Sequence, residues 1–180
     1  MRPRPGFDEE TVISQCKAGS LKYQEMLYKH FYGYAMGIGL RYCFSRDDAM
    51  ETVNDAFIKV FKSINSFSGE KPFKPWLRSV VINAAIDRRR KDMKLQLNTG
   101  LEHAAEITNH QTIIEDLNAQ DIIKLMQQIP VVQATVFNLY EIDGYSHDEI
   151  GAMLGLSASS SRVYLTRAKE KLRTLLTSDQ

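Results

Sequence analysis

The stretch DDAMETVNDAFIKVFKSI, residues 47–64, decides the fold class. Its apolar residues recur in steps of three and four, the repeat of an α-helix with one buried face. Asp47 and Asp48 lie in the expected first turn, where negative charge is favourable near the positive end of the helix dipole. We therefore predict an amphipathic helix here, with a buried face made of Met50, Val53, Phe57, Val60, Phe61 and Ile64.

The segments on both sides of this stretch also carry helical patterns, and none alternates for long enough to predict a strand. Residues 8–44 predict one or two helices, weakened locally by glycines. The Ser, Gly and Pro content of 66–72 predicts a loop, and Pro75 suits the first turn of a helix that ends at about Arg90. The expected fold class is all-α.

The helical pattern is lost over residues 92–112, which predicts a flexible linker between two helical domains. We place the domains at 8–92 and 119–177, and the linker at 93–118. The second domain is expected to hold helices at 121–128 and 131–141 and a turn at residues 143–144.

A capping box, S-x-x-E, opens a short helix at Ser146, and Gly155 ends it. Ser157 can then cap the last helix, whose buried seam is expected to be Leu165, Ala168, Leu172 and Leu175.

The net charge of +1 conceals an uneven distribution along the chain. Residues 71–91 hold seven Lys or Arg and one Asp, and residues 162–173 hold five Lys or Arg and one Glu. Two separated basic segments on a nearly neutral protein predict contact with a long polyanion at two points.

Membrane insertion and export are not expected. No run approaches 18 uncharged apolar residues, and the first residues lack the apolar core of a signal peptide, so we expect a cytoplasmic protein. Cys16 and Cys43 are too few for a disulfide framework and are expected to be reduced, structural thiols.

Catalytic motifs are not found, and neither a metal site nor a cofactor is expected. The four histidines lack the spacing of zinc ligands, and His103 and His110 fall in the expected linker. Phosphate-binding loops and nucleophile motifs are also missing. The sequence therefore does not predict an enzyme.

The segment from Ser146 to Arg173 has the outline of a helix-turn-helix. Its second helix would present several polar and basic side chains to the major groove, where Arg can read guanine. An ordinary helical hairpin with a solvated charged face is the alternative. The candidate DNA-binding residues are Ser159, Ser160, Arg162, Val163, Thr166 and Arg167.

A second candidate site combines aromatic rings with positive charge at residues 65–91. Single-stranded nucleic acid requires both, because bases stack on rings while cations follow the phosphates. The rings could equally belong to the core, and the Arg run could be a solvated helix end. The candidates are Phe67, Lys74, Trp76, Asn83, Asp87, Arg88, Arg89, Arg90 and Lys91.

The helix over 47–64 is acidic in its first half and basic only later. Because an acidic surface repels DNA, its exposed face suits a basic protein partner. A solvated face that complements the helix dipole is the alternative. The candidate partner-binding residues are Asp47, Asp48, Glu51, Asp55 and Lys59.

Three motifs together resemble one family along nearly the whole chain. The family is that of the extracytoplasmic-function (ECF) sigma factors. Its region 2.2 is similar to the stretch at 47–61, and its regions 2.3 to 2.4 are similar to PWLRSVVINAAIDRRR at 75–90. Its region 4 is similar to GYSHDEIGAMLGLS at 144–157 together with RAKEKLR at 167–173. The members of this family are small two-domain bacterial transcription initiation factors.

This resemblance implies specific partners for each candidate site. The first region would bind core RNA polymerase at the β′ clamp helices, with the β flap as a further contact. The second would open the -10 element and hold its non-template single strand, and the third would read the -35 duplex. The loop from Asn65 to Lys74 would receive a flipped base, and an anti-sigma factor would be the expected regulator.

The chain departs from the family at two positions of the helix-turn-helix. Many members have a β-branched apolar residue at the position of Ser161, and Ala is usual at that of Gly151. Because Ser161 falls on the buried seam, we expect looser packing of the recognition helix. Two other function classes stay open, a stand-alone helix-turn-helix regulator and an all-α enzyme acting on nucleic acid. The acidic helix and the aromatic, basic segment argue against the regulator, and the lack of clustered metal-binding carboxylates argues against the enzyme.

Overall fold

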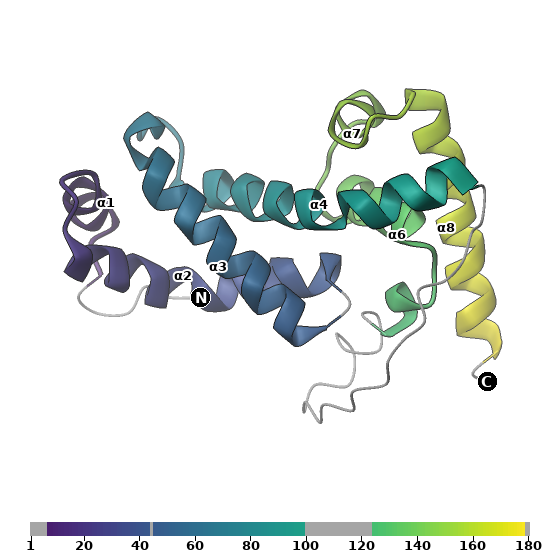
Figure 1. Ribbon diagram of the computed structural model, residues 1–180, viewed down its shortest axis with the longest axis horizontal. Helices are drawn as coiled ribbons and strands as arrows, with labels where there is room; N and C mark the ends of the chain where they lie inside the picture. The colour runs from purple at the N-terminus through teal and green to yellow at the C-terminus, as the bar shows by residue number, and fades with distance from the viewer. Residues whose placement is uncertain (1–6, 44, 100–123, 179–180) are drawn as a thin grey trace. The chain divides into compact units, whose positions relative to one another are not determined.

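The computed structural model describes residues 7–43, 45–99 and 124–178. Within them every regular element is a helix, as predicted (Figure 1). The chain divides into two compact units. The first contains the residues up to Gly39 and Arg46–Ala85, and the second contains Leu40–Ser45 and the residues from Ile86 onward.

The first unit is built from α1 (Glu9–Lys17), most of α2 (Leu21–Tyr42), α3 (Arg46–Ser63), the 3-10 turn η1 (Ile64–Ser66) and the first half of α4 (Phe73–Thr99). The predicted amphipathic helix is therefore confirmed as α3, and the predicted loop precedes α4. Five of the six residues expected on the buried face of α3 are at least partly buried. Met50 is the exception, because it is 41% exposed.

Close packing in the first unit depends on small and aromatic residues. A side-chain carbon at Gly39 would lie 3.3 Å from the carbonyl oxygen of Ala49, so glycine lets α2 approach α3 closely. The rings of Phe31 and Phe73 lie 5.0 Å apart and join α2 to the start of α4. On α1, Lys17 Nζ donates a 2.7 Å hydrogen bond to the carbonyl oxygen of Phe67.

Helix α4 is longer than predicted, because it continues nine residues past Arg90 to Thr99. Residues 93–99, expected to begin the linker, are therefore helical. Lys, Leu, Gln and Met have high helix propensity and can extend a helix without a regular apolar face. Met93 is also buried, which adds a tertiary contact that periodicity alone did not reveal. The remainder of the predicted linker, including His103 and His110, lies outside the described residues.

The second unit contains the helix-turn-helix. A helical turn at 124–127 precedes α6 (Val131–Phe137), which opens after Pro130 as predicted and continues as the π-helical segment η2 (Asn138–Ile142). The turn at Gly144, with a φ of +77°, leads to α7 (His147–Leu154) and then α8 (Ala158–Ser178). Residues 121–123 of the predicted helix at 121–128 are outside the described part of the chain.

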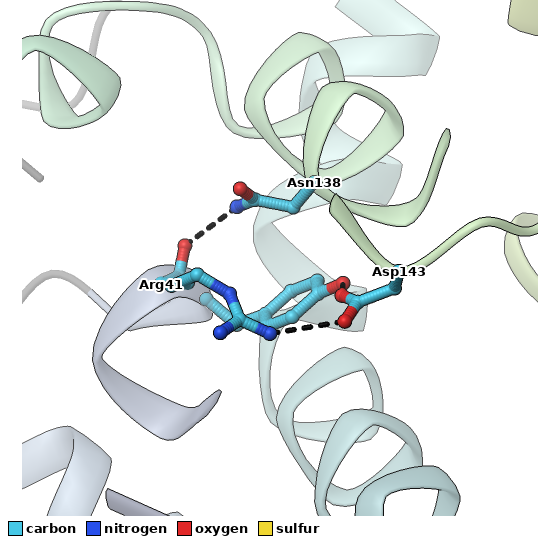
Figure 2. Close-up of polar contacts among 4 residues, drawn as sticks. Arg41, Asn138 and Asp143 are labelled. Atoms are coloured by element: carbon cyan, nitrogen blue, oxygen red, sulfur yellow. Dashed lines mark hydrogen bonds and ion pairs between the residues drawn. The ribbon is translucent and has the colours of Figure 1, made fainter. Parts of the chain in front are cut away.

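A buried polar cluster joins distant parts of the chain within the second unit (Figure 2). The carboxylate of Asp143, whose side chain is 0% exposed, pairs with Arg41 at 3.0 Å and accepts a hydrogen bond from the Tyr42 hydroxyl. Asn138 Nδ2 donates to the Arg41 carbonyl oxygen at 2.7 Å. Burial, and then the Asp143 carboxylate, raise the pKa of Tyr42, which keeps its hydroxyl protonated as a donor.

Both cysteines are free and buried, as expected, and burial raises the pKa of the Cys16 thiol. Such thiols are poor nucleophiles. In the described residues, none of the helices combines the length and the apolar character needed to span a bilayer.

Candidate nucleic-acid and polymerase interfaces

The acidic residues of α3 lie on its exposed side. Asp47, Glu51 and Asp55 are exposed at steps of four, so they form one row along the helix, and Asp48 is half-buried beside them. Lys59 is exposed one turn after the row ends. The opposite side is fixed in the core by Ala49, Thr52, Val53, Ala56, Phe57 and Val60.

Sequence analysis missed the apolar part of this exposed face. Met50 and Ile58 are 41% and 51% exposed, and both lie among the charged residues of α3. Exposed apolar side chains bordered by charges are typical of protein interfaces. Ile58 is an apolar residue that falls outside the predicted buried face of the helix, and this position was the available signal.

The aromatic residues before and at the start of α4 form a cluster. The rings of Phe67, Phe73 and Trp76 lie 5.3 to 5.5 Å from one another. Phe67 and Phe73 are buried, whereas Trp76 is partly exposed. The alternative that these rings belong to the core therefore holds for Phe67 and Phe73, and Trp76 is the ring at the edge of the cluster.

The polar candidates of α4 share one helical face. Asn83, Asp87 and Arg90 are exposed, and their spacing of four and three residues places them in one row along the helix. Trp76, seven residues before Asn83, lies on the same row. Lys94 continues the row and is also exposed, a residue that sequence analysis did not select. Arg88 and Lys74 are exposed too, and Lys74 Nζ lies 4.7 Å from the ring centre of Tyr34.

Arg89 differs from its neighbours in the Arg run because it is only 9% exposed. Its Nε donates to the Tyr42 carbonyl oxygen at 3.4 Å, which ties α4 to the end of α2. Residue type alone does not separate Arg89 from Arg88 and Arg90, whereas the packing of the three side chains does. The side chain of Lys91 lies outside the described part of the chain.

The first helix of the helix-turn-helix begins and ends as predicted. Ser146 Oγ accepts from the Glu149 amide at 3.3 Å, and the Ser146 amide donates to the Glu149 carboxylate at 2.8 Å, which completes the capping box. Ser146 Oγ also donates to the Glu149 carboxylate at 2.7 Å, and the two hydrogen bonds that this carboxylate accepts from Ser146 lower the pKa of Glu149. Gly155 ends α7 with a φ of +71°, a conformation that favours glycine.

The turn between α7 and α8 is unusually tight at Gly151. A side-chain carbon there would lie 2.6 Å from the carbonyl oxygen of Leu156, which is closer than van der Waals contact allows. The Leu156 amide also donates to the Gly151 carbonyl oxygen at 2.9 Å. The departure from the usual Ala at this position therefore has a steric reason.

The candidate residues of α8 are presented away from its buried seam. Ser157 Oγ accepts from the Ser160 amide at 3.0 Å and caps the helix as predicted. On the opposite side Leu165 and Ala168 are buried and Leu172 and Leu175 are partly buried. Ser160 is half-buried, and the other candidates are exposed: Ser159, Arg162, Val163, Thr166 and Arg167.

Two comparisons of sequence identify the family. A family model described as Sigma-70 region 2 matches residues 27–94, and one described as Sigma-70, region 4 matches residues 119–172, so together they match well over half of the chain. An ECF RNA polymerase sigma-E factor of Haemophilus influenzae is 23% identical over 176 residues, which cover 91% of this chain and 93% of the relative. The sigma-E factor of Escherichia coli K12 is 23% identical over 177 residues, with coverages of 91% and 92%.

The chain belongs to the ECF sigma factors. Its two matched regions follow each other in the order that the motifs predicted. As a sigma factor it serves transcription initiation, and the match to region 2 favours this function over that of a stand-alone helix-turn-helix regulator.

Solved structures agree on the fold of this sigma factor. RpoE of Bartonella quintana, in a co-crystal with the anti-sigma factor NepR, matches 87% of this chain and 98% of its own at 20% identity, with a TM-score of 0.56. CnrH, in complex with the cytosolic domain of CnrY, matches 96% and 99% at 22% identity, with a TM-score of 0.52.

Proposed function

We propose that this sigma factor binds core RNA polymerase through the exposed face of α3 and promoter DNA through α4 and α8, and that it catalyses no reaction itself. The observation that carries the proposal is the separation of charge. An acidic, partly apolar face on α3 and an exposed basic face on α8 belong to one chain, within the two regions that the family models match.

The face of α3 suits a basic protein groove. Its row of Asp47, Glu51 and Asp55 supplies charge, and Met50 and Ile58 supply the apolar surface that such an interface needs at its centre. We assign this face to the β′ clamp helices. The β flap is proposed as a second contact, made by the domain at 119–177.

The row on α4 suits the single strand of the -10 element. Trp76 offers an aromatic edge, Asn83 and Asp87 offer polar groups that can read a base, and Arg90 offers a cation for phosphate. Arg88 and Lys91 extend the phosphate contact. The exposed loop after η1 is the proposed place for a flipped base.

The exposed residues of α8 suit the major groove of the -35 duplex. Arg162 can read guanine and Arg167 can neutralise phosphate, while Ser159, Ser160, Val163 and Thr166 line the same helix. We propose 8–92 and 119–177 as the domains that engage the two elements, joined by 93–118.

The proposed regulator is an anti-sigma factor in the cytoplasm. Both solved structures named above contain a protein partner, and the partner of RpoE is named as an anti-sigma factor. A partner that covers α3 would compete directly with polymerase for the same exposed face.

Run-off transcription with purified core polymerase and a promoter library tests the whole proposal. The full chain should select promoters with two conserved elements, and core enzyme alone should select none. If transcription stays selective when the exposed face of α3 is altered and α8 is intact, the result would instead support a stand-alone regulator. Failure of the chain to bind core polymerase would contradict the proposal outright.

A further inference from the structure

Ser161 is the buried polar residue between the two helices of the helix-turn-helix. Its side chain is 0% exposed, and its Oγ lies 2.9 Å from Nδ1 of His147 at the start of α7. A buried hydroxyl without a hydrogen-bond partner would destabilise the fold. The contact to His147 supplies this partner. Ser161 is therefore held by a hydrogen bond, whereas a β-branched apolar residue at this position would be held by packing alone.

The imidazole of His147 connects three elements. It stacks on the ring of Tyr140 in η2, with the ring centres 4.4 Å apart and the planes 19° from parallel, while Nδ1 reaches Ser161 in α8. A ring fixed on one face by Tyr140 has little freedom to follow a movement of Ser161. The hydrogen bond therefore restricts α8 in rotation as well as in distance.

The close approach of α7 to the turn before α8 depends on Gly151, which lies one turn after His147 and is buried. A side-chain carbon at Gly151 would lie 2.6 Å from the carbonyl oxygen of Leu156. Apolar contacts tolerate sliding and rotation, whereas a hydrogen bond requires one distance and one direction. The hydrogen bond between His147 and Ser161 therefore sets the orientation of α8 more narrowly than apolar packing would.

We propose that His147 is a positioning residue for -35 recognition: through Ser161 it fixes the rotation of α8 about its axis and so the direction of the exposed residues that follow. Arg162 comes directly after Ser161, and Val163 and Thr166 lie within the next turns of the same helix. A small rotation about the helix axis would displace all three side chains relative to the base edges. The proposal rests on the assignment of α8 to the -35 element.

The protonation state of His147 supports this role. Burial, and then the nearby Arg162 guanidinium, lower the pKa of His147, although Asp148 opposes the shift. The neutral ring is therefore favoured, and its Nδ1 can accept a hydrogen bond from the Ser161 hydroxyl. Protonation in acid would turn Nδ1 into a donor and force the Ser161 hydroxyl to reverse its role.

The test uses holoenzyme assembled from core polymerase and the full chain, with a promoter library randomised over the -35 element. The measured quantity is selectivity, the ratio of transcription from the preferred element to that from single-base variants. His147→Leu and Ser161→Ala should each lower selectivity at least fivefold, and the double variant should lose no more than either one. His147→Asn, whose amide can bond to Ser161, should retain selectivity within twofold.

Two further readouts separate positioning from simple stability. Selectivity of the unchanged chain should fall as the pH drops below the lowered pKa of His147, whereas the His147→Asn variant should show a flat profile. Ala152→Ser, at an exposed position on α7, is the matched control and should change nothing. Circular dichroism confirms that each variant is folded.

The outcomes also distinguish this inference from the proposed function. Selectivity that survives both His147→Leu and Ser161→Ala, in a chain whose unchanged form is selective, would overturn the inference alone. Absence of -35 selectivity in the unchanged holoenzyme would overturn the assignment of α8 and this inference with it.

Discussion

Gly151 and Gly33 show that the same residue type has opposite roles in two helices. Gly151 is needed because a methyl group would meet the Leu156 carbonyl oxygen in the turn of the helix-turn-helix. Gly33 lies in α2, is exposed and would have no neighbour within 4 Å of an added carbon. At Gly33 glycine contributes only the entropic cost of a flexible residue in a helix.

We expect opposite changes in stability from alanine at these two positions. Gly151→Ala should lower the free energy of unfolding by about 1 to 2 kcal/mol, because overpacking costs more than the gain of about 1 kcal/mol in helix propensity. Gly33→Ala should raise it by about 0.5 to 1 kcal/mol. Urea unfolding of the full chain, followed by circular dichroism, measures both. A stabilising Gly151→Ala would show that the turn relaxes without cost.

Among the helices, the proposed binding face of α3 can be tested more directly than that of α4. Its buried face belongs to the core, whereas its acidic row is exposed and is the proposed polymerase site, so charges can be reversed there without disturbing the core. Substitutions in the Arg run of α4 are harder to interpret, because the buried Arg89 supports the fold and lies between the exposed Arg88 and Arg90.

Reversing two charges on α3 should abolish holoenzyme assembly. In Glu51→Lys combined with Asp55→Lys, attraction to a basic groove becomes repulsion, which costs several kcal/mol and weakens binding more than a hundredfold. Size-exclusion chromatography with core polymerase measures the binding. The control reverses two exposed acids elsewhere, Glu10 and Glu25. Normal co-elution of the folded α3 variant would rule out this face.

The residues of α4 should separate into three classes of effect. Asn83→Ala should change which -10 sequences are used, because it removes a group that reads a base, and Arg90→Ala should weaken all promoters alike, because phosphate carries no sequence. Arg89→Ala should instead lower the melting temperature, since its guanidinium is buried against α2. Permanganate footprinting and thermal unfolding distinguish these effects. An unchanged -10 preference in the Asn83 variant would move base reading elsewhere on α4.

At the scale of the whole molecule, we expect affinity for promoters to depend on joining two weak DNA contacts. The positive residues of α8 lie on one helix, so this domain can engage only a few phosphates, each of which adds about 0.9 to the salt slope. Polymerase would hold both domains at promoter spacing and convert these contacts into one bivalent interaction.

The isolated chain should therefore bind promoter DNA weakly and with little selectivity at physiological salt. Gel shifts with the free chain and with holoenzyme, on the same promoter and on a scrambled duplex, measure the difference. We expect holoenzyme to bind the promoter at least a hundredfold more tightly than the free chain does. Equal affinity and selectivity of the two would favour a stand-alone regulator.

The sequence by itself determined the features that depend on local order along the chain. The amphipathic repeat of α3, the capping box at Ser146 and the glycine stop at Gly155 could be predicted because helix faces and caps need only neighbours within one or two turns. The acidic and basic segments could likewise be counted directly. The family resemblance then gave the order of the binding regions.

Only the tertiary structure decided what neighbours in sequence cannot reveal. Arg88, Arg89 and Arg90 are of the same residue type, but packing against α2 buries one and leaves two exposed. Phe67 became core and Met50 became surface for the same reason. The pairing of His147 with Ser161 required two helices to meet, and a distance of 14 residues along the chain carries no signal of that contact. Contacts between elements are set by packing, whereas caps and repeats are set by the local chain.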